Sequence, residues 1–222
     1  MNSEKRSIIT IDGPSGAGKS TIAKLLAKRI GYTHIDSGAI YRGIAYAYSI
    51  RQNNETVDSL LSDLVLSFEF GENTRVRLGE QDITDEIRHP EISLLASSLS
   101  KLPEVRNHAN AMQRSLGQKG RVILEGRDTG SVVYPEADIK FYLDARPDER
   151  ANRRYSELVS KGVQAMPEAV RKEMEERDRN DTERAIAPLV VPDGAIYIDT
   201  TGLGVRGVLA AILRHIEGKD GI

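Results

Sequence analysis

The feature that most constrains the fold of this chain is an eight-residue stretch, Gly13-Pro-Ser-Gly-Ala-Gly-Lys-Ser20, which follows the apolar run Ile8–Ile11 after one aspartate. It matches G-x-x-x-x-G-K-[S/T], in which a glycine-rich turn between a strand and a helix directs backbone N–H groups at a phosphate. In this pattern Lys19 reaches the β- and γ-phosphates of a nucleotide, and the Ser20 hydroxyl is a ligand of Mg²⁺. We therefore expect ATP to be bound by Gly13, Pro14, Ser15, Gly16, Ala17, Gly18, Lys19, Ser20 and Thr21.

Short apolar runs alternate with helical patterns along most of the chain. Together with Ile8–Ile11, four runs bounded by polar or turn residues predict buried strands at Tyr32–Ile35, Arg121–Leu124, Ile139–Leu143 and Ala195–Ile198. Apolar residues at helical spacing predict helices at Lys19–Ile30, Ala39–Ile50, Pro103–Leu116, Asp148–Lys161, Pro167–Arg179 and Val205–Ile216. This alternation favours an α/β fold, with a five-stranded parallel sheet flanked by helices.

Two segments depart from the alternation. Between Val65 and Ile83, apolar residues alternate with polar ones at period two on either side of Gly71–Thr74, which predicts a small antiparallel insert. The segment Arg146–Arg184 is dense in arginine and glutamate and has few large apolar residues, which predicts a solvated helical hairpin. If the hairpin has a function, we expect it to act as a mobile lid.

The composition excludes several classes of protein. Thirty-one Lys plus Arg against thirty-three Asp plus Glu leave a net charge of -2, so we expect no nucleic-acid partner. The chain has no cysteine, which excludes a disulfide framework, a cysteine zinc site and a cysteine nucleophile. The first apolar run is far too short to span a membrane, so we expect a cytoplasmic protein with no membrane partner.

The phosphate-binding loop alone does not choose among kinases, GTPases and motor ATPases. A GTPase reads guanine with N-K-x-D, which is missing here, and the one D-x-x-G, Asp199–Gly202, follows the last predicted strand. The loop also lacks the third glycine of the dinucleotide-binding pattern. Phosphoryl transfer to a small molecule is the class that remains favoured.

Charged residues elsewhere in the chain predict a second anion site. The segment Asp36–Arg42 follows a predicted strand and opens a helix, with Ser37 expected to cap it. Arg127 and Asp128 follow another strand end, where ligands bind in open α/β sheets, and Arg177–Arg184 adds further charge from the hairpin. Taken singly, each charge suits a surface salt bridge, and only their joint arrangement favours a site.

Several motifs together resemble the bacterial cytidylate kinases, which are nucleoside monophosphate kinases. They are I-T-I-D-G-P-S-G-A-G-K-S-T at Ile9–Thr21, D-S-G-A-I-Y-R at Asp36–Arg42, E-I-R at Glu86–Arg88, P-x-V-R at Pro103–Arg106, G-R-D-x-G at Gly126–Gly130, and E-R-D with R-A-I-A-P-L at Glu176–Leu189. The resemblance implies a monomeric P-loop kinase with an enlarged monophosphate-binding insert and a helical lid. It implies reversible transfer of the ATP γ-phosphoryl group to CMP or dCMP, with Mg²⁺.

The resemblance also implies roles for individual residues. Those that match the family's acceptor-binding residues are Ser37, Arg42, Ser97, Arg106, Arg127, Asp128, Arg177, Asp181 and Arg184. Among them, Arg42, Arg127 and Arg177 would clamp the acceptor phosphate. Ser97, Arg106 and Asp128 would surround the base. The residues expected to act in catalysis are Lys19, Arg127, Arg177 and Arg184.

The expected subdivision of the single kinase domain 1–222 is a core of residues 1–38, 119–149 and 187–222, an insert of residues 39–118 and a lid of residues 150–186. For a second Mg²⁺ carboxylate, Asp36 and Glu125 are candidates. Two other functions stay open. One is a P-loop kinase of UMP or of a non-nucleotide alcohol, and the alcohol acceptor would require a general base. The other is a non-catalytic ATP-binding switch that orders a partner surface.

Overall fold

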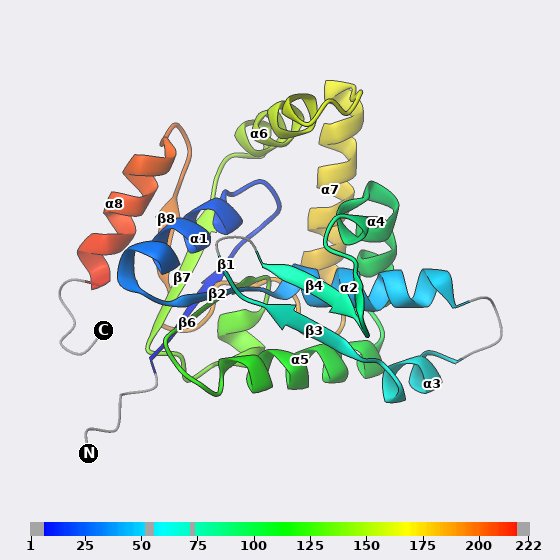
Figure 1. Ribbon diagram of the computed structural model, residues 1–222. Helices are drawn as coiled ribbons and strands as arrows, with labels where there is room; N and C mark the ends of the chain where they lie inside the picture. The colour runs from blue at the N-terminus through cyan, green and yellow to red at the C-terminus, as the bar shows by residue number, and fades with distance from the viewer. Residues whose placement is uncertain (1–6, 52–55, 72–73, 217–222) are drawn as a thin grey trace, which may run out of the picture. The chain divides into compact units, whose positions relative to one another are not determined.

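The computed structural model describes residues 7–51, 56–71 and 74–216 of the 222-residue chain (Figure 1). The described residues form two compact units. One contains the residues up to His34 together with those from Gly117 onward, and the other runs from Ile35 to Leu116. Within the described part, no helix combines the length and apolarity that crossing a membrane requires.

The first unit is built on the predicted α/β sheet. The strands of the sheet are β1 (Ile8–Asp12), β2 (Thr33–Asp36), β6 (Val122–Gly126), β7 (Ile139–Asp144) and β8 (Ile196–Asp199), in the order β2-β6-β1-β7-β8. The last two residues of β2 are counted with the second unit. Strand β1 pairs in parallel with β6 and β7, and β7 with β8. The predicted fold is confirmed. All five strands end one or two residues later than their last predicted apolar residue, because polar residues such as Asp12 and Asp144 still pair in the ladder.

Aliphatic packing holds the phosphate-binding loop on this sheet. Helices α1 (Lys19–Ile30) and α8 (Val205–Ile216) contact each other, and both contribute to the buried cluster around the central strands (Figure 1). Ile11 of β1 and Phe141 of β7 are fully buried in it. Directly after β1, Gly13 has φ +145°, and a Cβ there would lie 1.9 Å from the Leu143 carbonyl oxygen. The chain therefore enters the loop through a position that only glycine fits.

The predicted helical hairpin is confirmed. Helices α6 (Pro147–Ser160) and α7 (Pro167–Glu183) pack through Ala151, Val170 and Met174. Helix α7 continues four residues beyond the predicted end at Arg179, because no glycine or proline interrupts it before Arg184. The extension places Asp181 one helical turn after Arg177.

The second unit contains the predicted antiparallel insert, formed by β3 (Leu66–Glu69), β4 (Arg75–Leu78) and β5 (Gln81–Asp82) in the order β3-β4-β5. Its helices are α2 (Ser37–Ile50), α3 (Val57–Ser62), α4 (Pro90–Leu99), α5 (Pro103–Gly117) and the short 3₁₀ turn η1 (Glu86–Arg88). Ile40 and Ile44 of α2 are fully buried in a cluster with residues of α3, α4 and α5.

Two features of this unit differ from the sequence prediction. Helices α3 and α4 were not predicted, although Thr56 caps α3 by accepting from the Ser59 N–H at 3.2 Å, and Pro90 opens α4. The prediction that Ser37 caps α2 is wrong. Asp36 occupies the cap position without a side-chain capping bond, and Ser37 is the first residue of the helix and is buried.

Candidate functional site

The phosphate-binding loop has the backbone that its sequence predicts. Gly16 and Gly18 have φ of +74° and +88°, in the left-handed region that glycine adopts without strain. Helix α1 begins at Lys19, so its unpaired N–H groups and the positive end of its dipole lie at the loop. The Lys19 side chain is buried, and its Nζ donates to the Pro14 carbonyl at 2.7 Å. The lysine side chain thus reaches from the start of α1 back to the second residue of the loop.

The protonation of Lys19 is strongly affected by its surroundings. Burial lowers the pKa of Lys19 to about 7, and the positive charges of Arg127 and Arg177 add to that effect against Glu125 and Asp12. Without a nucleotide, the ammonium group is therefore poorly compensated. Phosphate oxygens would supply the missing negative charge and restore the proton.

We expect ATP binding at pH 8 to be accompanied by uptake of a large fraction of a proton per site, because Lys19 is then mostly neutral in the free protein and charged beside phosphates. Isothermal titration calorimetry at pH 8, in two buffers of different ionisation enthalpy, measures this uptake. The Lys19→Met variant should take up none. Uptake near zero by the wild-type protein would contradict the assigned protonation.

A set of oxygen donors lies at the start of α1. The Ser20 hydroxyl donates to Glu125 Oε2 at 2.8 Å, and His34 Nε2 lies 3.0 Å from Glu125 Oε1. Glu125 is buried near the end of β6, while Ser20 is exposed. A hydroxyl and a carboxylate are oxygen ligands that Mg²⁺ prefers, so these residues fit a Mg²⁺ ion at the phosphate loop. The other candidate carboxylate, Asp36, accepts from Arg42 Nη2 at 2.8 Å.

Two hairpin residues that the sequence analysis missed contact the loop. Arg150 Nη1 donates to the Ser15 carbonyl at 3.0 Å and also to the carboxylate of Asp178. The Ser15 N–H in turn points at Asp178 Oδ1, at 3.4 Å. Asp178 is the last residue of the E-R-D motif, so its position beside the predicted Arg177 was the available signal.

Four of the predicted acceptor residues gather in the first unit, at the end of β6 and the end of α7. Arg127 Nε donates to Asp181 Oδ2 at 2.8 Å. Arg184 Nη2 lies 3.4 Å from Asp128 Oδ1, and its Nη1 lies 3.8 Å from Asp181 Oδ1. The structure thus brings together residues more than fifty positions apart in the sequence.

The cluster is charged at neutral pH. Burial alone would raise the pKa of Asp181, but Arg127, Arg177 and Arg184 outweigh it and lower that pKa below its usual range. Burial likewise opposes the charge of Arg127, and Asp181 more than offsets it, so the pKa of Arg127 is raised. Three guanidinium groups around Asp181 form a positive arrangement suited to an anion.

The second unit holds four further predicted residues, Ser37, Arg42, Ser97 and Arg106, whereas Arg177 lies on α7 in the first unit. Arg106 is fully buried, donates to the Ser100 carbonyl at 3.3 Å and lies over the Tyr41 ring at 5.7 Å. The Ser100 hydroxyl donates to the Ser97 carbonyl at 2.8 Å, so Ser97 and Arg106 share one partner. Arg42 is held by Asp36, as given above.

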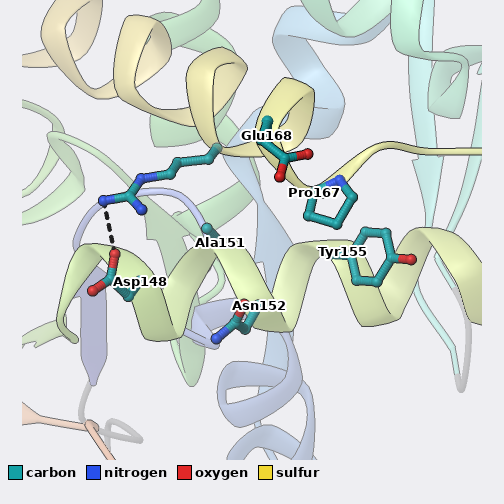
Figure 2. Close-up of a pocket in the computed structure, with 7 residues that line it drawn as sticks. Asp148, Ala151, Asn152, Tyr155, Pro167 and Glu168 are labelled. Atoms are coloured by element: carbon teal, nitrogen blue, oxygen red, sulfur yellow. Dashed lines mark ion pairs between the residues drawn. The ribbon is translucent and has the colours of Figure 1, made fainter.

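A separate shallow pocket of about 290 Å³ lies between the two hairpin helices (Figure 2). Its lining residues are Asp148, Ala151, Asn152, Tyr155, Pro167, Glu168 and Arg171, and none of them is a predicted site residue. The ion pair between Arg171 and Asp148, at 2.9 Å, crosses from one helix to the other. Both partners are more than half exposed, so the pair contributes little to stability.

Comparisons with known proteins agree with this geometry. The family model described as cytidylate kinase matches residues 9–218. A cytidylate kinase from Carboxydothermus hydrogenoformans is 41% identical over 219 residues, which cover 96% of this chain and 99% of that protein. Another from Geobacter sulfurreducens is 45% identical over 207 residues, with 91% and 89% covered.

Solved structures show the same fold at low sequence identity. Shikimate kinase from Bacteroides thetaiotaomicron superposes with a TM-score of 0.51 and 12% identity, covering 95% of this chain and 98% of that chain. This likeness concerns the fold alone. The match of the family model to nearly the whole chain, and the identity to curated relatives, go further: the chain belongs to the cytidylate kinase family.

Proposed function

We propose that this protein transfers the γ-phosphoryl group of ATP to CMP or dCMP, giving ADP and CDP or dCDP. The observation that carries the proposal is the occurrence, in one unit, of the phosphate-binding loop with Lys19 and of the arginine cluster around Asp181. The names of the relatives support the choice of cytidine nucleotides.

The reaction needs no general base. The second pKa of a phosphate monoester is about 6, so the acceptor phosphate is mostly a dianion at pH 7 and attacks unaided. The task of the protein is to bring two anions into line and to neutralise charge in a loose transition state. Lys19, Arg127, Arg177 and Arg184 are suited to that role. This separates the proposal from a kinase of alcohols, which would need an aspartate base.

Mg²⁺ would be held by Ser20 and, directly or through water, by Glu125, which lies 2.8 Å from the Ser20 hydroxyl. When bound, the ion neutralises charge on the β- and γ-phosphates. Asp36 is the weaker candidate, because it is engaged by Arg42. The backbone N–H groups of the loop and the start of α1 would hold the phosphates themselves.

We assign CMP binding to the nine predicted residues by their chemistry. Arg42, Arg127 and Arg177 would clamp the phosphate, and Asp181 would accept from a ribose hydroxyl. Cytosine offers an N4 amino donor to Asp128 and N3 and O2 acceptors to Arg106 and Ser97. The set is completed by Ser37 and Arg184. Uracil presents O4 in place of the N4 amino group, so a carboxylate disfavours UMP.

Closure of the α6–α7 hairpin over both nucleotides would exclude water and prevent hydrolysis of the phosphoryl group. The ties from Arg150 and Asp178 to Ser15 support a coupling of this hairpin to the phosphate loop. The monomeric state, the cytoplasmic location and the lack of a nucleic-acid partner stay predictions, as do the boundaries of core, insert and lid.

In the Asp128→Asn variant, the ratio of kcat/KM for CMP to kcat/KM for UMP should fall by about ten- to a hundred-fold. The reason is that the amide can donate to uracil O4, whereas the carboxylate accepts only from the cytosine amino group. Parallel steady-state kinetics with both nucleotides measure the ratio. Asp148→Asn, which neutralises an exposed aspartate on α6, is the matched control and should leave it unchanged. An unaltered ratio in Asp128→Asn would remove Asp128 from base recognition.

The proposed function is tested by mixing purified protein with Mg-ATP and, in parallel, CMP, dCMP, UMP, AMP and GMP, and following ADP release in a coupled assay. Rapid release with CMP and dCMP, and much less with UMP, is the expected result. If UMP were preferred, the base assignments would be wrong while monophosphate phosphorylation stood. ATP binding without turnover on any of the five would favour the non-catalytic switch.

A further inference from the structure

Asp12, the last residue of β1, lies at the centre of the sheet and has no assigned role. Its neighbours in the ladder are Gly126 of β6 and Tyr142 of β7, and its side chain is fully buried. Its carboxylate accepts three hydrogen bonds. Oδ1 receives the Thr129 N–H at 2.9 Å and the Thr129 hydroxyl at 2.8 Å, and Oδ2 receives the Gly130 N–H at 2.7 Å.

These donors belong to the single π-helical turn η2 (Thr129–Val133), which directly follows β6 and the Arg127–Asp128 pair. The turn is packed closely against β1. A Cβ on Gly130 would lie 2.6 Å from Thr10 Oγ1 and 3.2 Å from Asp12 Oδ2, so the backbone leaves no room for a larger residue. Asp12 is therefore a polar anchor of the turn on the central strand.

Anchoring this turn restricts the two preceding residues. Asp128 is one peptide bond from the anchored Thr129, and its Oδ1 lies 3.4 Å from Arg184. Arg127, one residue earlier, donates to Asp181 across fifty-four positions of sequence. When a side chain that positions a substrate is displaced by about 1 Å, the reaction rate can fall by about 10²-fold.

Asp12 does not have the surroundings of a general base. Its side chain has no exposed surface, and every hydrogen bond given above is directed at the turn. Burial raises the pKa of Asp12 to about 6 despite the three hydrogen bonds, which oppose the shift. At pH 7 the group is thus mostly ionised and able to accept all three donors.

We propose that Asp12 is a positioning residue for acceptor recognition, which holds the turn after β6 so that Arg127 and Asp128 present their charged groups to the monophosphate. The inference rests on the proposed function, in which those two residues contact CMP. Asp12 directly precedes the phosphate loop, yet on this proposal it affects recognition of the acceptor CMP and not the affinity for ATP.

The test is the isosteric variant Asp12→Asn. Its amide oxygen can replace only one carboxylate oxygen, and the NH₂ group faces a backbone N–H, so at least one hydrogen bond is lost and two donors oppose each other. We expect kcat/KM for CMP to fall by about 10²-fold and the CMP:UMP ratio to fall about tenfold. The dissociation constant of ATP, measured by calorimetry, should stay within about twofold, because the residues of the loop are unchanged and Asp12 affects Lys19 less than burial, Arg127, Glu125 and Arg177 do.

Two further variants complete the experiment. Thr10→Val removes a buried hydroxyl without a hydrogen-bond partner, on the same strand, and should behave as wild type. Thr129→Val keeps both backbone hydrogen bonds and loses the third, so a drop of about fivefold in kcat/KM for CMP is expected, with ATP affinity unchanged. If Asp12→Asn does not fold, the kinetics and ATP affinity of Thr129→Val test the proposal in its place.

An Asp12→Asn protein with the wild-type CMP:UMP ratio would overturn the inference. So would equal losses of CMP and ATP affinity, which indicate a general structural defect. Wild-type behaviour of a soluble Thr129→Val protein has the same meaning if the first variant does not fold. Failure of the wild-type protein itself to phosphorylate CMP is a different result, because it contradicts the proposed function.

Discussion

The Lys19→Met variant should lose about 10³-fold in kcat with CMP, or about 4 kcal/mol of transition-state stabilisation. Lys19 is the buried cation of the phosphate loop, and methionine keeps its length without its charge. The free energy of unfolding of the nucleotide-free protein should not fall. Burial depresses the pKa of Lys19 to about 7, so the folded state disfavours the charge that the unfolded chain carries.

The protonation of Lys19 also makes the free energy of unfolding depend on pH, in a direction that follows from the number of protons bound in each state. Between pH 7 and the usual lysine pKa of 10.5, the unfolded chain binds more protons at Lys19 than the folded protein does, so this residue makes stability rise with pH. The destabilising effect of Lys19 is fully present below pH 7. Lys19→Met removes it, so urea unfolding at pH 7 should show equal or greater stability.

Steady-state kinetics and urea unfolding of the same preparation measure both effects. Lys24→Met, an exposed position on the same helix, is the control and should change neither activity nor stability much. A Lys19→Met enzyme within tenfold of wild type would contradict the role of this lysine. A large loss of stability would contradict its protonation as assigned here.

The Arg127→Met variant should lose about 10³-fold in kcat/KM for CMP, because it removes a guanidinium group that we propose clamps the acceptor phosphate. Its stability should also fall, by about 3 kcal/mol, since Asp181 is left buried without its shortest partner. The two losses have different causes, and a second substitution separates them.

In the double variant Arg127→Met with Asp181→Asn, stability should recover, because the buried carboxylate is neutralised, while activity should not. Arg171→Met is the matched control, because it removes an arginine whose ion pairs are solvent-exposed, and it should change kcat/KM by less than about twofold. Recovery of activity in the double variant would show that Arg127 serves only to neutralise Asp181.

The parts of the fold that local chemistry determines were predictable from the sequence. The five strands and the helix after the loop follow from apolar runs, and the loop backbone follows from its glycines. The strand ends were less predictable, because Asp12 and Asp144 pair in the ladder although they are polar. Helix α4 was missed because its apolar residues are buried by packing against α2, which lies about fifty positions earlier in the sequence.

The candidate site divides in the same way. A phosphate loop with Lys19 and Ser20 could be predicted from the order of residues alone, because that motif is continuous and its geometry is local. Three further contacts could not be predicted in this way: the Ser20 hydroxyl donates to Glu125, Arg150 and Asp178 contact Ser15, and Asp12 accepts hydrogen bonds from the turn beside Arg127. Each of these contacts joins residues more than one hundred positions apart in the sequence, and only the packing of strands and helices brings them together.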